Sequence, residues 1–145
     1  MLSRTNARAA IGIVSAALAC AATIGCESDP PRPAGSADVR LDQGKRSATV
    51  AMTGMLRVEL EGNEGTGYGW RLGAIDSARL EKVGEPTVTP LDPGLRGGRT
   101  ITSFEFRPLV PGSTQLVFEL VRPWLTDEPP ARRAEVEVTI KGGGA

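Results

Sequence analysis

Apolar and polar residues alternate with a period of two along most of the chain between residues 39 and 141. Five runs show the alternation most clearly, at residues 56–60, 68–72, 104–106, 116–120 and 136–140. This period is typical of β-strands that bury one face and expose the other. Proline and glycine separate the runs, as turns between strands require.

Helical periodicity is almost absent. The one partial candidate, at residues 74–83, is short enough to be a single turn. Short strands separated by turns predict an all-β fold, an immunoglobulin-like antiparallel β-sandwich of about seven strands. We place this domain at residues 39–141, followed by a Gly-rich tail at 142–145. A domain of about 100 residues buries roughly 60–70% of its unfolded surface, which is adequate without a disulfide.

The first 25 residues have the layout of a secretory signal peptide. Arg4 and Arg8 give a basic start, and residues 9–25 carry no charge. This apolar run is marginal in length for crossing a bilayer. It ends in ATIGC, which resembles a bacterial lipobox, so the signal peptide is of the lipoprotein type and Cys26 is the expected lipidated residue.

Two alternatives to lipidation at Cys26 remain open. The sequence ALAC offers Cys20 as a rival site, and Thr23 is less usual in a lipobox than leucine, which leaves plain secretion possible. Residues 26–38, rich in proline, serine and charge, predict a flexible tether. We therefore expect an exported protein, lipid-anchored in a bacterial cell envelope, either periplasmic or at the cell surface.

Composition excludes several classes of function. The 17 Lys and Arg balance the 17 Asp and Glu, so no basic surface for nucleic acid is expected. Histidine, the most frequent general acid–base and metal ligand, does not occur, and both cysteines precede residue 27. We expect no enzyme, no cofactor and no metal site.

The acidic residues do not change this expectation. Glu59, Glu119 and Glu135 alternate with apolar residues, as they do on solvated strand faces, so carboxylate catalysis is set aside. Asp127 and Glu128 lack the ligand spacing of a calcium-binding loop.

Three stretches between the strands have unusual composition. They read GNEGTGYGW at residues 62–70, PLDPGLRGGRT at 90–100 and RPWLTDEPP at 122–130. In an immunoglobulin-like sandwich the B–C, D–E and F–G connections lie at one end. We expect these stretches to form one composite edge, with glycine-rich backbone on two loops and Trp124 on the third.

The three stretches resemble the motifs of a known family. Residues 63–70 are similar to the NPTTGY-x-W signature of the chagasin family, which inhibits papain-like cysteine proteases. Residues 122–124 resemble that family's RPW motif, and residues 95–98 approximate its GxGG motif. The resemblance extends over about residues 40–141, with all three motifs in order.

The chain departs from the family pattern at three positions. Glu64 and Gly65 stand where the family usually has proline and threonine, and Leu95 stands at the first glycine of the second motif. We expect the first loop to be freer than is usual for the family, because glycine adds backbone freedom and the loop lacks the proline.

The resemblance implies a reversible inhibitor that blocks the active-site cleft with three loops and is not cleaved. It implies that Thr66 and Gly67 form the tip nearest the catalytic cysteine, and that Trp124 packs on the cleft rim with Arg122 beside it. Tyr68 and Trp70 fall on one strand face, and Trp70 is expected in the core. The residues expected to bind the protease are Asn63, Glu64, Gly65, Thr66, Gly67, Tyr68, Leu95, Arg96, Gly97, Gly98, Arg122, Pro123 and Trp124.

The expected partners are a papain-like cysteine protease and, through the lipid on Cys26, a membrane. A monomer with no nucleic-acid partner is expected. The alternative function is an immunoglobulin-like envelope lipoprotein that uses the same loop edge for assembly or adhesion. Likewise, Trp124 could cover the core instead of anchoring a partner.

Overall fold

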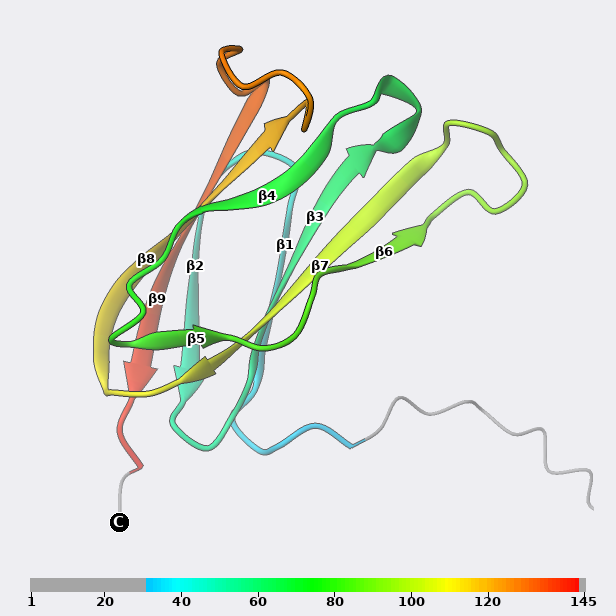
Figure 1. The fold of residues 1–145 in the computed structure, drawn as a ribbon. Coiled ribbons are helices and arrows are strands. Elements are labelled where there is room, and N and C mark those ends of the chain that lie inside the picture. The colour runs from blue at the N-terminus through cyan, green and yellow to red at the C-terminus, as the bar shows by residue number, and fades with distance from the viewer. Residues whose placement is uncertain (1–30, 144–145) are drawn as a thin grey trace, which may run out of the picture. The chain divides into compact units, whose positions relative to one another are not determined.

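The computed structural model describes residues 31–143, which form nine strands in two sheets (Figure 1). The predicted signal peptide, both cysteines, the first part of the predicted tether and the last two residues lie outside the described residues. The strands are β1 (Ala37–Leu41), β2 (Gly44–Ala51), β3 (Leu56–Asn63), β4 (Gly69–Ala74), β5 (Leu80–Lys82), β6 (Thr87–Pro90), β7 (Arg99–Pro108), β8 (Gly112–Val121) and β9 (Arg132–Lys141).

Helical structure within residues 31–143 is limited to the 3₁₀ turn η1 (Glu64–Thr66). Within residues 31–143 there is thus no helix long and apolar enough to cross a membrane. The weak helical pattern at residues 74–83 is a turn, in which the Arg79 and Leu80 amides both donate to the Asp76 carbonyl at 3.0 Å. Strand β5 follows directly.

The two sheets form the predicted sandwich. The first sheet has the order β1-β3-β7-β5. Strand β6 also pairs with β7, on the same side as β5 but along a different part of the strand. The second has the order β2-β9-β8-β4. About seven strands were predicted, and the structure has nine. The number is higher because two short strands, β5 and β6, share one edge of β7, and because β1 and β2 are separate strands at the edges of different sheets.

Two strand pairs differ from the antiparallel prediction. Strands β1 and β3 run parallel, as do β2 and β9, while the other pairs are antiparallel. The chain leaves the first sheet after Leu41 and joins the second at Gly44, whose φ of 85° turns the backbone. Because β1 begins at Ala37, the last two residues of the predicted tether belong to a strand.

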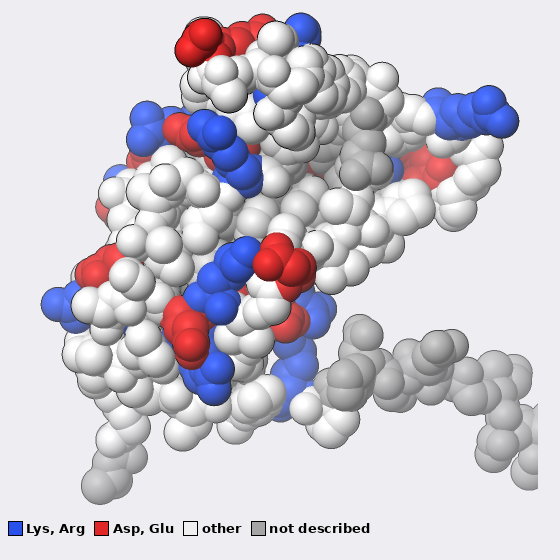
Figure 2. Space-filling view, viewed as in Figure 1, with Lys and Arg blue, Asp and Glu red and all other residues white. Residues whose placement is uncertain are grey.

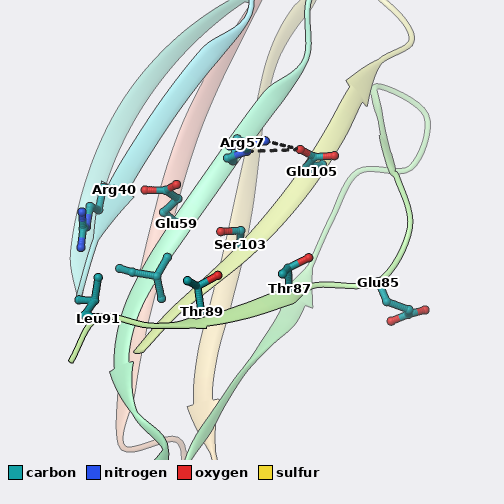
Figure 3. Close-up of a pocket in the computed structure, with 10 residues that line it drawn as sticks. Arg40, Arg57, Glu59, Glu85, Thr87, Thr89, Leu91, Ser103 and Glu105 are labelled. Carbon is teal, nitrogen blue, oxygen red and sulfur yellow. Dashed lines mark hydrogen bonds and ion pairs between the residues drawn. The ribbon is translucent and has the colours of Figure 1, made fainter. Parts of the chain in front are cut away.

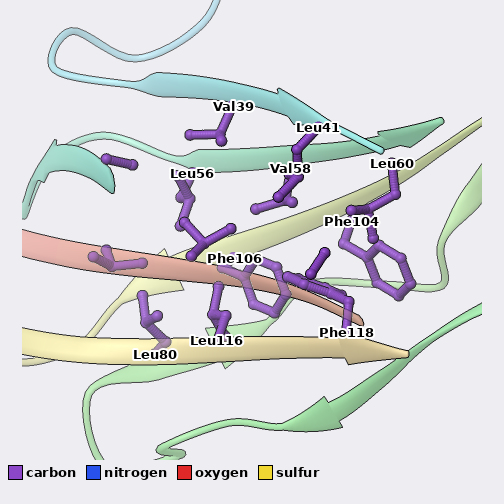
Figure 4. Packing of buried hydrophobic residues seen from close by; sticks show 14 of the residues in the cluster. Val39, Leu41, Leu56, Val58, Leu60, Leu80, Phe104, Phe106, Leu116 and Phe118 are labelled. Carbon is purple, nitrogen blue, oxygen red and sulfur yellow. The ribbon is translucent and has the colours of Figure 1, made fainter. Parts of the chain in front are cut away.

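The predicted alternating residues meet between the sheets (Figure 4). Leu56, Val58 and Leu60 of β3 are fully buried. Phe104 and Phe106 of β7 pack on Phe118 of β8 across the sandwich, with ring centroids 5.0 and 6.1 Å apart. Tilted aromatic pairs add about 0.5–1.5 kcal/mol each beyond their buried area. All three phenylalanines of the chain thus lie in one contact between the sheets.

Trp70 of β4 is buried, as predicted, with 7% of its surface exposed. Its indole Nε1 donates a hydrogen bond to the Glu61 carbonyl of β3 at 3.1 Å. This bond joins the two sheets directly below the loop between β3 and β4.

We predict that Trp70→Ala lowers the free energy of unfolding by about 3–5 kcal/mol, because it removes a large buried ring. Trp70→Phe is the matched control, since it keeps a ring but loses the N–H donor. Its loss should be on the order of 1–2 kcal/mol. Chemical denaturation measures both values, and an alanine variant as stable as the parent would contradict the core position of Trp70.

Candidate functional site

The three unusual stretches lie at one end of the sandwich (Figure 1). Loop 1 (residues 63–68) joins β3 to β4, loop 2 (residues 91–98) joins β6 to β7, and loop 3 (residues 122–131) joins β8 to β9. Strands β3, β6 and β8 all end at this edge, so the two sheets bring together segments that are about 60 residues apart in the chain. Every sequence-predicted site residue belongs to one of these loops.

Loop 1 closes on itself. The Asn63 side-chain oxygen accepts a hydrogen bond from the Gly65 amide at 2.9 Å, and the Thr66 hydroxyl donates to the Asn63 carbonyl at 2.7 Å. The 3₁₀ turn η1 lies between these contacts, and Gly67 leaves it with a φ of 76°. Asparagine is suited to this role because its short amide reaches backbone two residues ahead. The tip of loop 1 is therefore a shaped backbone turn.

Loop 2 consists of two consecutive turns. The Leu95 amide donates to the Asp92 carbonyl at 3.2 Å around Pro93 and Gly94, and Gly94 has a φ of 96°. Proline followed by a glycine of positive φ is the pattern of a type II turn. The second turn has Arg96 in place of proline and again a glycine of positive φ: the Gly98 amide donates to the Leu95 carbonyl at 3.3 Å, and Gly97 has a φ of 72°.

A clamp closes the base of loop 2. The Arg99 amide and Nε both donate to Asp92 Oδ2, at 3.3 and 3.2 Å, and the Leu91 amide donates to the Arg99 carbonyl at 2.8 Å. The hydrogen bond from the Arg99 side chain lowers the pKa of Asp92 below its ordinary value. Neither residue was predicted at the site, although the Asp-Pro-Gly sequence is itself a turn signal.

Loop 3 begins where Pro123 prevents β8 from continuing. The Arg122 guanidinium lies over the Tyr68 ring at 4.6 Å from its centroid, and its Nε is 3.9 Å from Glu128 Oε2. These contacts hold Arg122 between loops 1 and 3. Trp124 is 65% exposed, so it does not cover the core.

Glycines allow the three loops to touch one another. A Cβ placed on Gly65 would lie 2.5 Å from the Gly97 Cα, and one placed on Gly67 would lie 2.5 Å from the Trp124 Cη2. Real Cβ atoms essentially never come so close. Loop 1 therefore lies between loops 2 and 3, in contact with both. Gly65, predicted to make loop 1 freer, is the point at which loop 2 packs against it.

A separate groove of about 380 Å³ lies on the outer face of the first sheet (Figure 3). Glu59 lines it, as do Arg57 and Glu105, whose Nη2 and Oε1 are 2.9 Å apart. The lining has no histidine or cysteine, and this ion pair is of the kind found on a solvated strand face. Within residues 31–143, no three His, Cys, Asp or Glu gather as a metal site would require.

Of three similar known structures, the two with TM-scores above 0.5 share this fold. The crystal structure of the cysteine protease inhibitor EhICP2 from Entamoeba histolytica has a TM-score of 0.60 at 19% identity, covering 73% of this chain and 95% of that chain. The solution structure of amebosin has a TM-score of 0.54 at 22% identity, covering 77% and 100%. The structure of PbICP-C in complex with falcipain-2 has a TM-score of 0.48 at 21% identity, covering 72% and 98%.

Sequence comparison identifies the family. No curated protein matches the chain by sequence. Residues 49–140 match the family model described as chagasin family peptidase inhibitor I42. This range is more than half of the chain and contains all three motif stretches, so the resemblance seen in the motifs is confirmed. The chain belongs to the chagasin family of peptidase inhibitors and is an inhibitor, not an enzyme.

Proposed function

We propose that this protein reversibly inhibits papain-like cysteine proteases by inserting loop 1 into the active-site cleft, with loops 2 and 3 on either side. The contact of loop 1 with both neighbours, through Gly65 and Gly67, is the observation that carries this proposal. It makes one narrow edge out of three separate loops. The residues proposed to bind the protease are those predicted from the motifs.

The tip of loop 1 suits a narrow cleft. A papain-like protease has a thiolate–imidazolium pair at the floor of its cleft. Gly65 and Gly67 have no side chain, and Thr66 between them is small, so backbone can approach that floor closely. Since hydrogen bonds to Asn63 already shape the tip, little ordering entropy is lost on binding.

The same geometry explains why the inhibitor should remain intact. Cleavage requires a peptide carbonyl held in a near-attack position beside the thiolate. In loop 1 the chain curls into the 3₁₀ turn η1 instead of running extended. The Asn63 and Thr66 hydrogen bonds oppose its straightening, so a bound tip presents no aligned peptide bond.

Trp124 supplies the apolar contact on the rim. One edge of its indole rests on Gly67, and the remainder is exposed. Tryptophan and arginine are the residues that most often dominate interface energies. Arg122, held by Tyr68 and Glu128, fixes the backbone from which Trp124 projects.

The alternative function, an envelope lipoprotein that uses this edge for assembly or adhesion, is not favoured. It would need the same exposed edge but gives no reason for a tip made of two glycines and a small threonine. Membership of a family of peptidase inhibitors favours inhibition.

We also propose that the protein is exported and anchored through a lipid on Cys26, in the periplasm or at the cell surface. The lipobox-like sequence ATIGC, which ends at Cys26, supports this proposal. Ala37, the first residue of β1, pairs with Leu56 at the start of β3, whereas loop 1 follows the end of β3. The chain therefore enters the described domain, through β1, at the end opposite the loops.

Titration of purified residues 27–145 against papain tests the function. We expect tight, reversible inhibition, with the inhibitor recovered intact by mass spectrometry. Full papain activity with micromolar protein present would contradict the proposed function. An inactivating cut near Thr66 would contradict the mechanism but not the target class.

Trp124→Ala should weaken inhibition about thirtyfold, equivalent to about 2 kcal/mol, because it removes the rim anchor. The free energy of unfolding should change by less than about 0.5 kcal/mol, since the side chain lies outside the core. Val110→Ala, at an exposed position between β7 and β8, is the matched control and should alter neither. Loss of stability without loss of inhibition would disprove the anchor role.

Gly65→Ala should weaken inhibition at least about tenfold, because its Cβ would separate loop 1 from Gly97 by clashing with the backbone. Gly69→Ala is the control, since a Cβ there meets nothing within 4 Å. Inhibition constants measured for both variants decide the point. Equal values for the two would show that the contact between loops 1 and 2 is unimportant for binding.

Cys26→Ser should release the domain into the soluble fraction of the native host, because a mature chain that begins at Cys26 contains no other cysteine to carry the lipid. Cell fractionation with an antibody against the domain measures this. Cys20→Ser is the matched variant and should leave the protein in the membrane fraction. Release by Cys20→Ser instead would move the lipidation site, and a soluble parent protein would indicate plain secretion.

A further inference from the structure

Two apolar side chains flank the tip of loop 1. Among the large hydrophobic residues exposed in residues 31–143, Leu95 on loop 2 and Trp124 on loop 3 are the most exposed, at 71% and 65%; the next, Val110, reaches 47%. A single exposed leucine is ordinary on a protein surface. Here, however, it stands on the far side of the proposed wedge from the proposed tryptophan anchor.

The backbone of loop 2 holds Leu95 in place. Leu95 is the last residue of the first turn and the first residue of the second, so its amide donates and its carbonyl accepts within the loop. The clamp between Asp92 and Arg99 closes both turns at their base. Arg96 is the second residue of the second turn, directly after Leu95. Both side chains therefore project from a preorganised backbone, and binding would order little beyond their own rotamers.

Loop 2 carries an exposed cation at its tip, whereas loop 3 carries two exposed acids, one of which is paired with Arg122. Figure 2 shows a basic group at the tip of loop 2 and, over loop 3, acidic groups with a basic one beside them. The residues concerned are Arg96 on loop 2 and Asp127 with Glu128 on loop 3, all of them exposed. Charges at an interface rim chiefly set the rate and orientation of association. The cation of loop 2 would meet one wall of the cleft while the acids of loop 3 meet the other.

We propose that Leu95 and Arg96 form a second anchor, which selects papain-like proteases whose cleft wall facing loop 2 combines an apolar depression with carboxylates. This inference rests on the proposed function and names the kind of target within it. Burial of Leu95 would slow dissociation, because exposing it again costs apolar contact with the wall. Arg96 would speed association through a salt-dependent attraction.

Association and dissociation rates test the second anchor. The probe is a papain-like protease of acidic isoelectric point that the parent protein inhibits, with one of basic isoelectric point for comparison. Arg96→Glu should slow association with the acidic protease about tenfold at low ionic strength, and the difference should shrink at about 0.5 M salt. It should not slow association with the basic protease. Leu95→Ala should speed dissociation from the acidic protease about tenfold.

Matched variants separate this inference from the proposed function. Lys141→Glu makes the same charge change at the end of β9, which lies at the other end of the strand from loop 3, and Val110→Ala removes a comparable exposed apolar group. Both should keep parental rates within about twofold. The second anchor would be overturned if Arg96→Glu and Leu95→Ala behaved like these controls. The proposed function would still stand if Trp124→Ala weakened inhibition. A parent protein that inhibits no papain-like protease would overturn both.

Discussion

Absence of a side chain at two positions determines how closely the three loops can pack. Gly65 lies against the backbone of Gly97, and Gly67 lies against the indole of Trp124. A Cβ on either glycine would lie only 2.5 Å from an atom of that neighbour. The sandwich brings the strand ends to one edge, but the glycines decide the spacing within that edge. The proposed function requires a tip thin enough to enter a cleft, and the same two glycines allow the neighbouring loops to support that tip closely.

Local contacts give each loop its shape, through hydrogen bonds in loops 1 and 2 and a cation–π contact in loop 3. Asn63 closes loop 1, the paired turns and the Asp92–Arg99 clamp close loop 2, and Arg122 links loop 3 to Tyr68. The ion pairs involved are solvent-exposed and add little stability on their own. Their effect is to restrict the loops before binding, so that less conformational entropy is lost when a partner is bound.

The sequence was most informative where a side-chain period is intrinsic to the backbone. Alternation at residues 56–60 predicted the buried face of β3, because successive strand residues point to opposite sides. The parallel pairing of β1 could not be predicted, since alternation does not encode a strand's partner or direction. Gly65 was interpreted as added freedom, whereas in the fold its missing side chain makes room for loop 2. Asp92 and Arg99 were missed, because their contact depends on the path of the turns between them.

The strand edges have a bearing on behaviour at high concentration. Edge strand β6 follows Pro86 and ends at Pro90, and neither residue has an amide donor. At the edge of the other sheet, a bulge between Leu72 and Ala74 breaks the regular register of β4. Short or interrupted edges are poor templates for pairing with another chain. The molecule can thus keep its loop edge open for a partner while these two sheet edges resist adding strands from neighbouring copies.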